Sequence, residues 1–402
     1  MATMDEWNSI GSSKRNVMSP KIVNRAPGIG EGVDEYLEPL LNKVLMTKSF
    51  GINLGAIELC QVAASCPEGK GDRFRISIPY ANHKLEWIVM FNSICPDEGP
   101  DFEFSDRSFL ADPALHTLEK FVPSLYNWNH LEPDALLAVI TELVAHYKKH
   151  QIDQLNQFSD RLNVEYKTMI SGTDINEDDV ELILLPDSVQ PEEAHFLIRL
   201  AIDFSKLPGK HPFLNNDAAM LLVTFQGAHW NRITPNLYFS KNVKETFSNS
   251  TSLHLPSFPS EKTLVDYVPE VKKLINSKID TIATNFEKKR TFIAAVLILQ
   301  GPSVLEYDCV EFNYISLMLV HRDFYFILHF NLPPTFPWTP PRISLQSIYH
   351  MTSKTELFKQ GIANNCPYSP RWQPDYMFTQ ALRHVITVEI NKFKNASTKN
   401  RR

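Results

Sequence analysis

The sequence predicts an α+β protein in which one arrangement, a helix, an antiparallel meander and a closing helix, is used twice. Near each end of the 402-residue chain, strand-like runs separated by polar and glycine-containing turns follow a helical segment. Each meander leads into a P-x-x-x-P step, at Pro96 and Pro100 in the first and at Pro337 and Pro341 in the second. With 43% hydrophobic and 21% charged residues, most of the chain is expected to fold. Its length allows two or three domains.

The first unit is predicted over residues 33–150. Apolar residues from Leu37 to Leu45 recur at helical spacing, with Asp34 placed to cap this helix and Gly51 to end it. The runs AIELCQV, RFRISIP and LEWIVMF predict three strands, and DFEF a fourth. A second helix follows Pro133, which suits a first turn. Its apolar positions are Leu136, Leu137, Ile140, Leu143, Val144 and Tyr147.

The second unit is predicted over residues 285–394. A helix over NFEKKRTFIAAVLILQ stops at Gly301 and Pro302. The runs VLEYD, FNYISLMLVH, DFYFILHF and RISL predict strands, and a helix from Tyr376 to Phe393 closes the unit.

A degenerate third copy is predicted over residues 151–284. Here Pro208 and Pro212 precede the strand AMLLVTF. This region ends in a helix with Pro269 in its first turn. The apolar face of that helix comprises Val271, Leu274, Ile275, Ile279 and Ile282.

The stretch HFNLPPTFPWTPPRISLQS, residues 329–347, concentrates prolines and aromatics. Proline fixes φ and withholds a backbone donor, so such a stretch can end one strand and rigidify the crossover to the next. Phe336 and Trp338 are expected to fill the space beneath this loop. The alternative is a surface loop of the kind that SH3 domains bind. Its position between two strongly apolar strands favours the crossover.

Several classes of function find no support in the sequence. A net charge of −6 gives no global basic surface for nucleic acid, and the basic residues 395–402 read as a solvated tail. No apolar run is long enough to span a membrane. Five cysteines without a framework, and no secretory signal in the aperiodic leader over residues 1–32, favour a cytosolic or nuclear protein. Because H-x-H, H-E-x-x-H, C-x-x-C and a nucleotide-binding glycine loop are all missing, no metal or cofactor is predicted.

The order of elements, with the motif FPWTPPRISLQSIYH, resembles the ubiquitin-conjugating (UBC) fold. Six further segments look like the BRE family, the brain and reproductive organ-expressed proteins, and this resemblance spans residues 18–394. It implies ubiquitin E2 variant (UEV) domains at both ends and an RWD-like module between them. The six segments are DRFRISIPYANHKLEWIVMFN, PDFEF, FLADPAL, LHLPSFPSEKTLVDYVPEV, RTFIAAVL and CPYSPRW.

The same resemblance implies a non-catalytic scaffold in assemblies that cleave lysine-63-linked ubiquitin chains. These are the cytoplasmic BRISC complex and a nuclear complex associated with the breast-cancer susceptibility protein, with roles in DNA repair, the cell cycle and apoptosis. A JAMM/MPN metalloprotease subunit would perform the cleavage. One end module would bind an Abraxas-type MPN-like scaffold and the C-terminal one a von Willebrand factor A-type subunit. Direct contact with ubiquitin stays open.

Cys366 tests whether conjugating chemistry remains. A conjugating enzyme needs a thiolate and an oxyanion donor from a His-Pro-Asn motif. Here Met351 and Thr352 stand where Pro and Asn would follow His350, and Cys366 comes 16 residues after that histidine. The sequence therefore predicts no catalysis. An active conjugating enzyme using Cys366, and a UEV adaptor that binds proline-containing peptides, are the alternatives.

Two aromatic segments hold the candidate interaction residues. CPYSPRW contains Tyr368, Arg371 and Trp372, and YNWNHLEP contains Tyr126 and Trp128. Aromatic residues and arginine are enriched at interface hot spots, because they bury a large area while retaining a polar end. The competing interpretation, equally weighted, is that these aromatics belong to the core.

Overall fold

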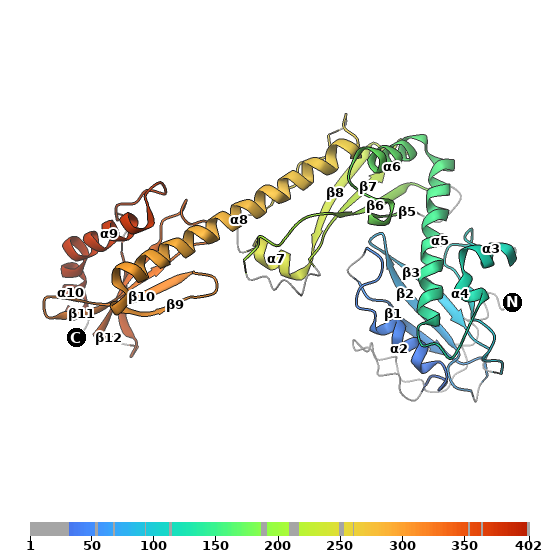
Figure 1. The fold of residues 1–402 in the computed structure, drawn as a ribbon, viewed down its shortest axis with the longest axis horizontal. Coiled ribbons are helices and arrows are strands. Elements are labelled where there is room, and N and C mark those ends of the chain that lie inside the picture. Colours follow the sequence, from blue (N-terminus) through green and yellow to red (C-terminus); the bar gives the residue numbers. More distant parts are fainter. Residues whose placement is uncertain are drawn as a thin grey trace. The chain divides into compact units, whose positions relative to one another are not determined.

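A computed structural model describes residues 32–52, 55–66, 69–92, 94–111, 115–185, 191–208, 217–248, 253–259, 261–352, 354–362 and 365–399. It divides into two compact units, Met1–His150 and Gln151–Arg402. Within the described residues, three antiparallel sheets each follow a helix, which confirms the α+β class (Figure 1). The predicted leader up to residue 31, Pro212 and the end of the basic tail lie outside the described residues.

The first sheet is the predicted meander. Along β2 and β3 alternate side chains are buried, so that Ile76 and Trp87 lie opposite each other on the core face. The prediction that Asp34 caps the first helix is wrong, because the helix begins later, and Gly51 lies beyond its C-cap, Thr47. The backbone carbonyl of Asp34 instead accepts a bond from the Leu37 N–H. The elements are α2 Glu38–Met46, β1 Glu58–Ala63, β2 Arg73–Tyr80, β3 His83–Met90 and β4 Asp101–Glu103, in sheet order β1-β2-β3-β4.

Three helices follow this sheet. Helix α5 packs on the core face through Tyr147, whose ring centroid lies 5.5 Å from that of Tyr80 and 5.0 Å from that of Phe109. The predicted apolar positions of this helix are buried except Leu137, which is half-buried. The helices are α3 Leu115–Phe121, α4 Pro123–Tyr126 and α5 Ala135–Phe158.

The middle sheet lies in the region predicted to hold a third copy, and only one of its four strands matches a predicted strand. AMLLVTF forms β7, whereas β5, β6 and β8 were missed. VELILL and EAHFLIRL lack the alternation that identifies a half-buried strand, since nearly every residue in them is buried. The elements are α6 Asp160–Gly172, β5 Val180–Leu185, β6 Glu193–Leu200, β7 Ala219–Gln226, β8 Arg232–Phe239 and α7 Lys241–Ser248, in sheet order β5-β6-β7-β8.

A single 37-residue helix, α8 (Leu264–Gln300), replaces the two helices predicted on either side of residue 284. Residues 281–288 contain no glycine or proline, so nothing in the sequence interrupts the backbone hydrogen bonds there. Pro269 lies in the second turn, not the first. At the start of the helix, the buried carboxylate of Glu165 accepts a 2.7 Å bond from the Leu264 N–H. Burial raises the pKa of Glu165, and this bond opposes the shift.

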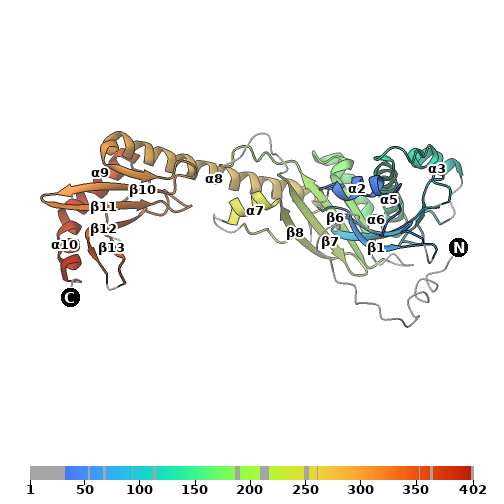
Figure 2. The ribbon, with the colours of Figure 1, turned by 90° about the horizontal axis from the view of Figure 1, so that it is seen from below.

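The C-terminal sheet has five strands, one more than predicted, because β13 returns beside β12. Helices α8 and α9 lie on the same side of this sheet (Figure 2). The predicted closing helix is present as α9, a π-helical turn over Val385–Glu389 and α10. The elements are β9 Val304–Tyr307, β10 Tyr314–His321, β11 Phe324–Asn331, β12 Arg342–Met351, β13 Leu357–Gly361, α9 Pro374–His384 and α10 Ile390–Lys399, in sheet order β13-β12-β11-β10-β9.

The proline-rich stretch forms the loop from β11 to β12 and is held against α8. These strands pair directly as antiparallel neighbours, so the loop, which we call the proline crossover, spans no other strand. Phe336 is buried, with its ring centroid 5.4 Å from that of Phe292, as predicted. Trp338 was predicted to be buried as well, but 73% of its surface is exposed. The Asn285 side-chain amide donates a 3.3 Å bond to the Pro334 carbonyl. The crossover therefore rests on α8 through the packing of Phe336 on Phe292 and the hydrogen bond from Asn285.

Phe292 should carry much of the stability of the C-terminal part. Replacing it with alanine is expected to lower the free energy of unfolding by about 3–5 kcal/mol, because the cavity left behind adds to the lost burial. Urea unfolding measures this. Ile298→Ala is the control, since Ile298 lies on the same helix but is 84% exposed, and we expect a change below about 0.5 kcal/mol. Similar losses in the two variants would contradict this account of the core.

Candidate interaction surfaces

A pocket of about 800 Å³ lies where α8, the proline crossover and α9 meet. Its walls come from segments that are distant in sequence and include Pro340, Pro341, Cys366, Tyr368 and Met377. The wall combines apolar and polar surface, and Thr339 and Arg342 are among its polar residues. Two of the residues singled out in the sequence, Cys366 and Tyr368, therefore line one cavity.

Tyr368 has a structural role in this pocket. Its hydroxyl donates a hydrogen bond to the Pro337 carbonyl of the proline crossover. Burial raises the pKa of Tyr368 to about 12, so the phenol stays protonated and remains a donor at neutral pH. The residue ties the segment before α9 to the crossover.

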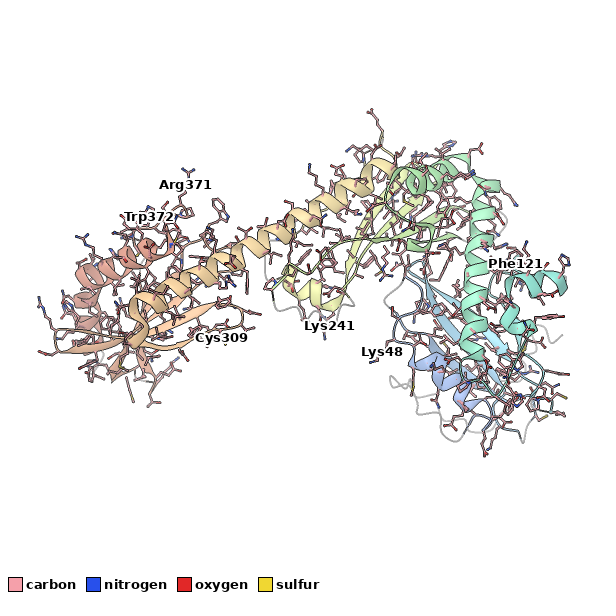
Figure 3. All side chains as sticks on the ribbon, viewed as in Figure 1. Lys48, Phe121, Lys241, Cys309, Arg371 and Trp372 are labelled. Carbon is pink, nitrogen blue, oxygen red and sulfur yellow. The ribbon has the colours of Figure 1, made fainter. Side chains whose placement is uncertain are left out.

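Arg371 and Trp372 differ in what they offer a partner. Trp372 is half-buried against the C-terminal core, and its ring meets that of Tyr376 edge-on with centroids 5.0 Å apart. Arg371 is exposed and projects away from the ribbon (Figure 3). Tyr376, in the first turn of α9, is exposed and was missed. Its place beside Trp372 depends on the turn between them, which the sequence does not reveal.

Cys366 lacks the environment of a nucleophile. It is half-buried, and burial, assisted by the charge of Glu389, raises the pKa of its thiol. A reactive cysteine requires the opposite shift, toward thiolate. His350 stays within β12, where its Nδ1 lies 3.0 Å from the Ser347 hydroxyl, and it does not line the pocket. Asn364, close to the cysteine in sequence, lies outside the described residues.

In the first unit, the structure separates the two predicted aromatics. Trp128 is half-buried with its ring centroid 6.0 Å from that of Phe91. Tyr126, at the end of α4, is exposed. Sequence reasoning missed Ile94 and Leu131, whose apolar side chains are both strongly exposed. The loops that carry them are joined by a 3.1 Å contact between His130 Nδ1 and the Asp97 carboxylate. We call Ile94, Tyr126 and Leu131 the first-unit patch.

The described part of the chain holds neither a cluster of metal ligands nor a membrane-crossing helix. No group of three or more His, Cys, Asp or Glu side chains there could hold a metal ion. None of the helices described is long and apolar enough to cross a bilayer.

Comparison with known proteins matches the chain, over residues 31–351, to the family described as brain and reproductive organ-expressed protein (BRE). The chain is 34% identical over 361 residues to "BRISC and BRCA1-A complex member 2" of Danio rerio, covering 87% of this chain and 92% of that protein. A protein of the same name from Branchiostoma floridae is 33% identical over 386 residues, covering 92% and 98%. The family match ends at the last residue of β12, so Cys366, Tyr368, Arg371 and Trp372 lie beyond it.

The thiol of Cys366 should react slowly. At pH 8 we expect iodoacetamide to alkylate it several-fold more slowly than the exposed Cys309, since only the thiolate reacts and burial raises the Cys366 pKa. The alkylation rate of Cys366 should still increase with pH above pH 9, which is the ordinary pKa of a thiol. Peptide mapping by mass spectrometry over a time course measures both sites in one sample. Preferential alkylation of Cys366 would show an activated thiol and contradict this assignment.

Proposed function

The chain belongs to the BRE family, and we propose that it is a non-catalytic scaffold subunit of a deubiquitinase complex that cleaves lysine-63-linked ubiquitin chains. The observation that carries the proposal is the extent of the match. Relatives named as members of the BRISC and BRCA1-A complexes align with 87% and 92% of this chain. The likeness therefore includes all three sheets and is not confined to one module.

In this proposal, residues 33–150 and 285–394 are UEV-like domains and residues 151–284 form an RWD-like module. Support comes from the recurring order of a helix followed by an antiparallel meander. The middle and C-terminal modules share α8, because that helix crosses residue 284 without a break. Such sharing suits a scaffold, since a common helix restricts how two binding modules can move.

A scaffold role also agrees with the chemistry of the described residues. The raised pKa of the half-buried Cys366 thiol disfavours thioester formation. Cleavage in the proposed complex is the task of a JAMM/MPN metalloprotease subunit. An Abraxas-type MPN-like subunit and a von Willebrand factor A-type subunit are the other proposed partners, in both cytoplasm and nucleus.

The proposed partners need surfaces, and each unit offers one. In the first unit, the first-unit patch consists of three exposed side chains, Ile94, Tyr126 and Leu131. In the unit Gln151–Arg402, Arg371 is exposed and lies next to Trp372 in the loop that precedes α9. An exposed aromatic and an exposed arginine are the residue types that most often dominate an interface.

Affinity purification of the tagged full chain, followed by mass spectrometry, tests the proposal. We expect an MPN metalloprotease, an MPN-like scaffold and a von Willebrand factor A-type protein, and lysine-63-specific cleavage by the purified assembly. Cys366→Ala should leave that cleavage unchanged. Recovery of endosomal-sorting proteins instead would favour the adaptor that binds proline-containing peptides. A ubiquitin thioester that forms with activating enzyme and disappears in Cys366→Ala would favour the conjugating enzyme.

The two proposed surfaces should be separable by single substitutions. We expect Tyr126→Ala and Arg371→Ala each to weaken recovery of one partner at least fivefold, because both side chains are exposed and neither supports a core. Quantitative mass spectrometry of the purified assembly measures the losses. Each variant is the control for the other, as they lie in different units. Unchanged recovery in both would remove these residues from the interfaces.

A further inference from the structure

In the described part of the chain, residues 318–321 of strand β10 pair with no strand on the β9 side, although the 3-10 turn Gly301–Ser303 contacts β10. The edge strand β9 pairs with residues 315–317 of β10. The pairing has a bulge between Ser316 and Leu317, and its last pair is Val304 with Leu317. In the parts of the chain that the structure describes, residues 318–321 pair only with β11, on the other side. This open edge measures roughly 13 Å at 3.3 Å per residue.

The hydrogen bonds around β10 show which backbone groups face the open edge. The Asp308 N–H donates to the Tyr314 carbonyl on the β9 side, whereas the Leu332 N–H donates to the Asn313 carbonyl on the β11 side. Alternate residues of an antiparallel strand direct their backbone groups to opposite neighbours. Met318 and Val320 are in phase with Tyr314, so their N–H and C=O groups point to the open edge.

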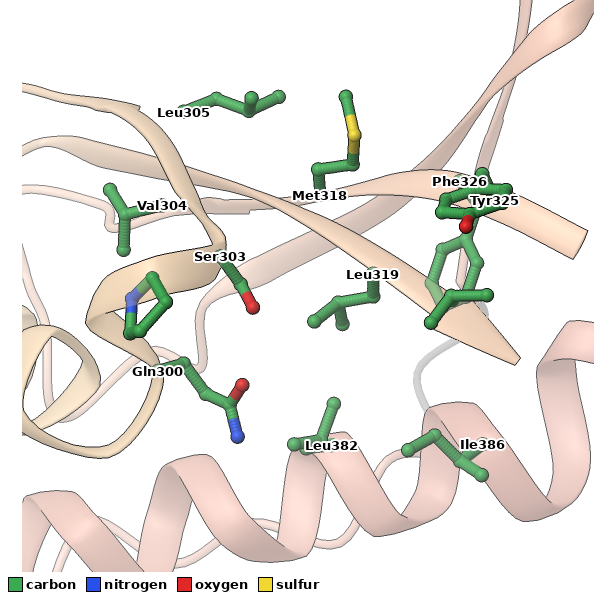
Figure 4. A pocket seen from close by; sticks show the side chains of 12 residues that line it. Gln300, Ser303, Val304, Leu305, Met318, Leu319, Tyr325, Phe326, Leu382 and Ile386 are labelled. Atoms are coloured by element: carbon green, nitrogen blue, oxygen red, sulfur yellow. The ribbon is translucent and has the colours of Figure 1, made fainter. Parts of the chain in front are cut away.

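A pocket of about 470 Å³ lies directly beside this edge (Figure 4). Leu382 and Ile386 come from the helical layer below, and Leu319 and Phe326 come from the strands. Side chains alternate between the faces of a sheet, so in a strand added along β10 the residue opposite Leu319 would enter the pocket. Its two neighbours would lie on the outer face with Met318 and Val320, both of which are exposed.

Natural proteins usually protect an open edge with charged side chains, proline or a bulge. Here β9 has a bulge and Pro302 lines the pocket, but the residues that follow along β10, Met318 and Val320, are apolar and exposed, as are Leu305 and Tyr325. We propose that the open edge of β10 and its pocket bind a short, extended peptide segment of a partner protein as an additional strand. The segment would carry an apolar side chain at its centre and polar or small residues on either side.

The size of the edge favours a peptide over a second copy of this chain. Pairing limited to four residues per copy falls well short of the roughly 1,200 Å² that specific protein interfaces bury. A short peptide needs no more than this edge, because its backbone bonds provide affinity and a single pocket provides selectivity. The proposal concerns an edge that the scaffold role does not require.

Proline at position 320 tests the proposal, because it removes the N–H that faces the open edge and none that bonds to β11. A random decapeptide phage library would be panned against the immobilised full chain, and enriched peptides synthesised and measured by fluorescence polarisation. We expect Val320→Pro to weaken binding at least tenfold. Val320→Ala, which keeps the N–H, should weaken it less than threefold.

Hydrogen exchange of the wild-type chain gives a readout that does not depend on how the proline variant folds. The peptide should slow exchange at the amides of Met318 and Val320. Equal affinity for wild type and Val320→Pro, absence of any enriched peptide, or unchanged exchange at these two amides would overturn the proposal. So would concentration-dependent self-association abolished by Val320→Pro, because the occupant would then be a second copy.

Discussion

Helix α8 belongs to two hydrophobic cores at once. The compact unit Gln151–Arg402 depends on the burial of this helix in both cores. Its first half contributes Val271, Ile275 and Ile279 to the core under the middle sheet, and its second half contributes Phe292, Ile293 and Val296 to the core under the C-terminal sheet. Neither core is complete without the helix. Because one continuous helix contributes to both cores, no flexible linker separates the middle and C-terminal modules.

The position of the proline crossover follows from the same helix. Asn285 and Phe292 hold the crossover from below. The buried Lys289 donates a 2.7 Å bond to the Asn313 side chain just before β10, and burial lowers the pKa of that lysine. Tyr368 closes the crossover from the side of α9. These contacts shape the larger pocket and leave Trp338 exposed beside it, so the conspicuous prolines serve the architecture. The first and last sheets bury one face against helices, whereas nearly every residue of β5, β6 and β7 in the middle sheet is buried. The surfaces open to partners include loops, outer faces and the open edge of β10.

Much of the architecture was predictable because its determinants are local. Strands of the first and last sheets can be recognised by the alternation of apolar and polar residues and by the turns between them. One such turn contains Ala81 and Asn82, both at positive φ. The middle sheet was harder, since β5 and β6 lack alternation. At the candidate sites, the sequence pattern could not separate anchored side chains from exposed ones. Tyr368 and Trp372 are anchored, whereas Arg371 and Tyr126 are exposed, and nothing in the local pattern separates these cases.

By itself, then, the sequence determined the α+β class, the repeated order of elements, the crossover with Phe336 beneath it, and the family. Only the tertiary structure decided that two predicted helices are one, that Trp338 is exposed while Phe336 is buried, and that the Cys366 thiol is shielded. It alone shows that β9 ends before β10 does. Residues 281–288, without glycine or proline, permit the continuous helix locally. For the other three the physical reason is common. Hydrophobic periodicity and turn chemistry are patterns over a few neighbouring residues. The burial of a side chain, the pKa of a thiol and the free edge of a strand depend instead on which distant segments pack beside them.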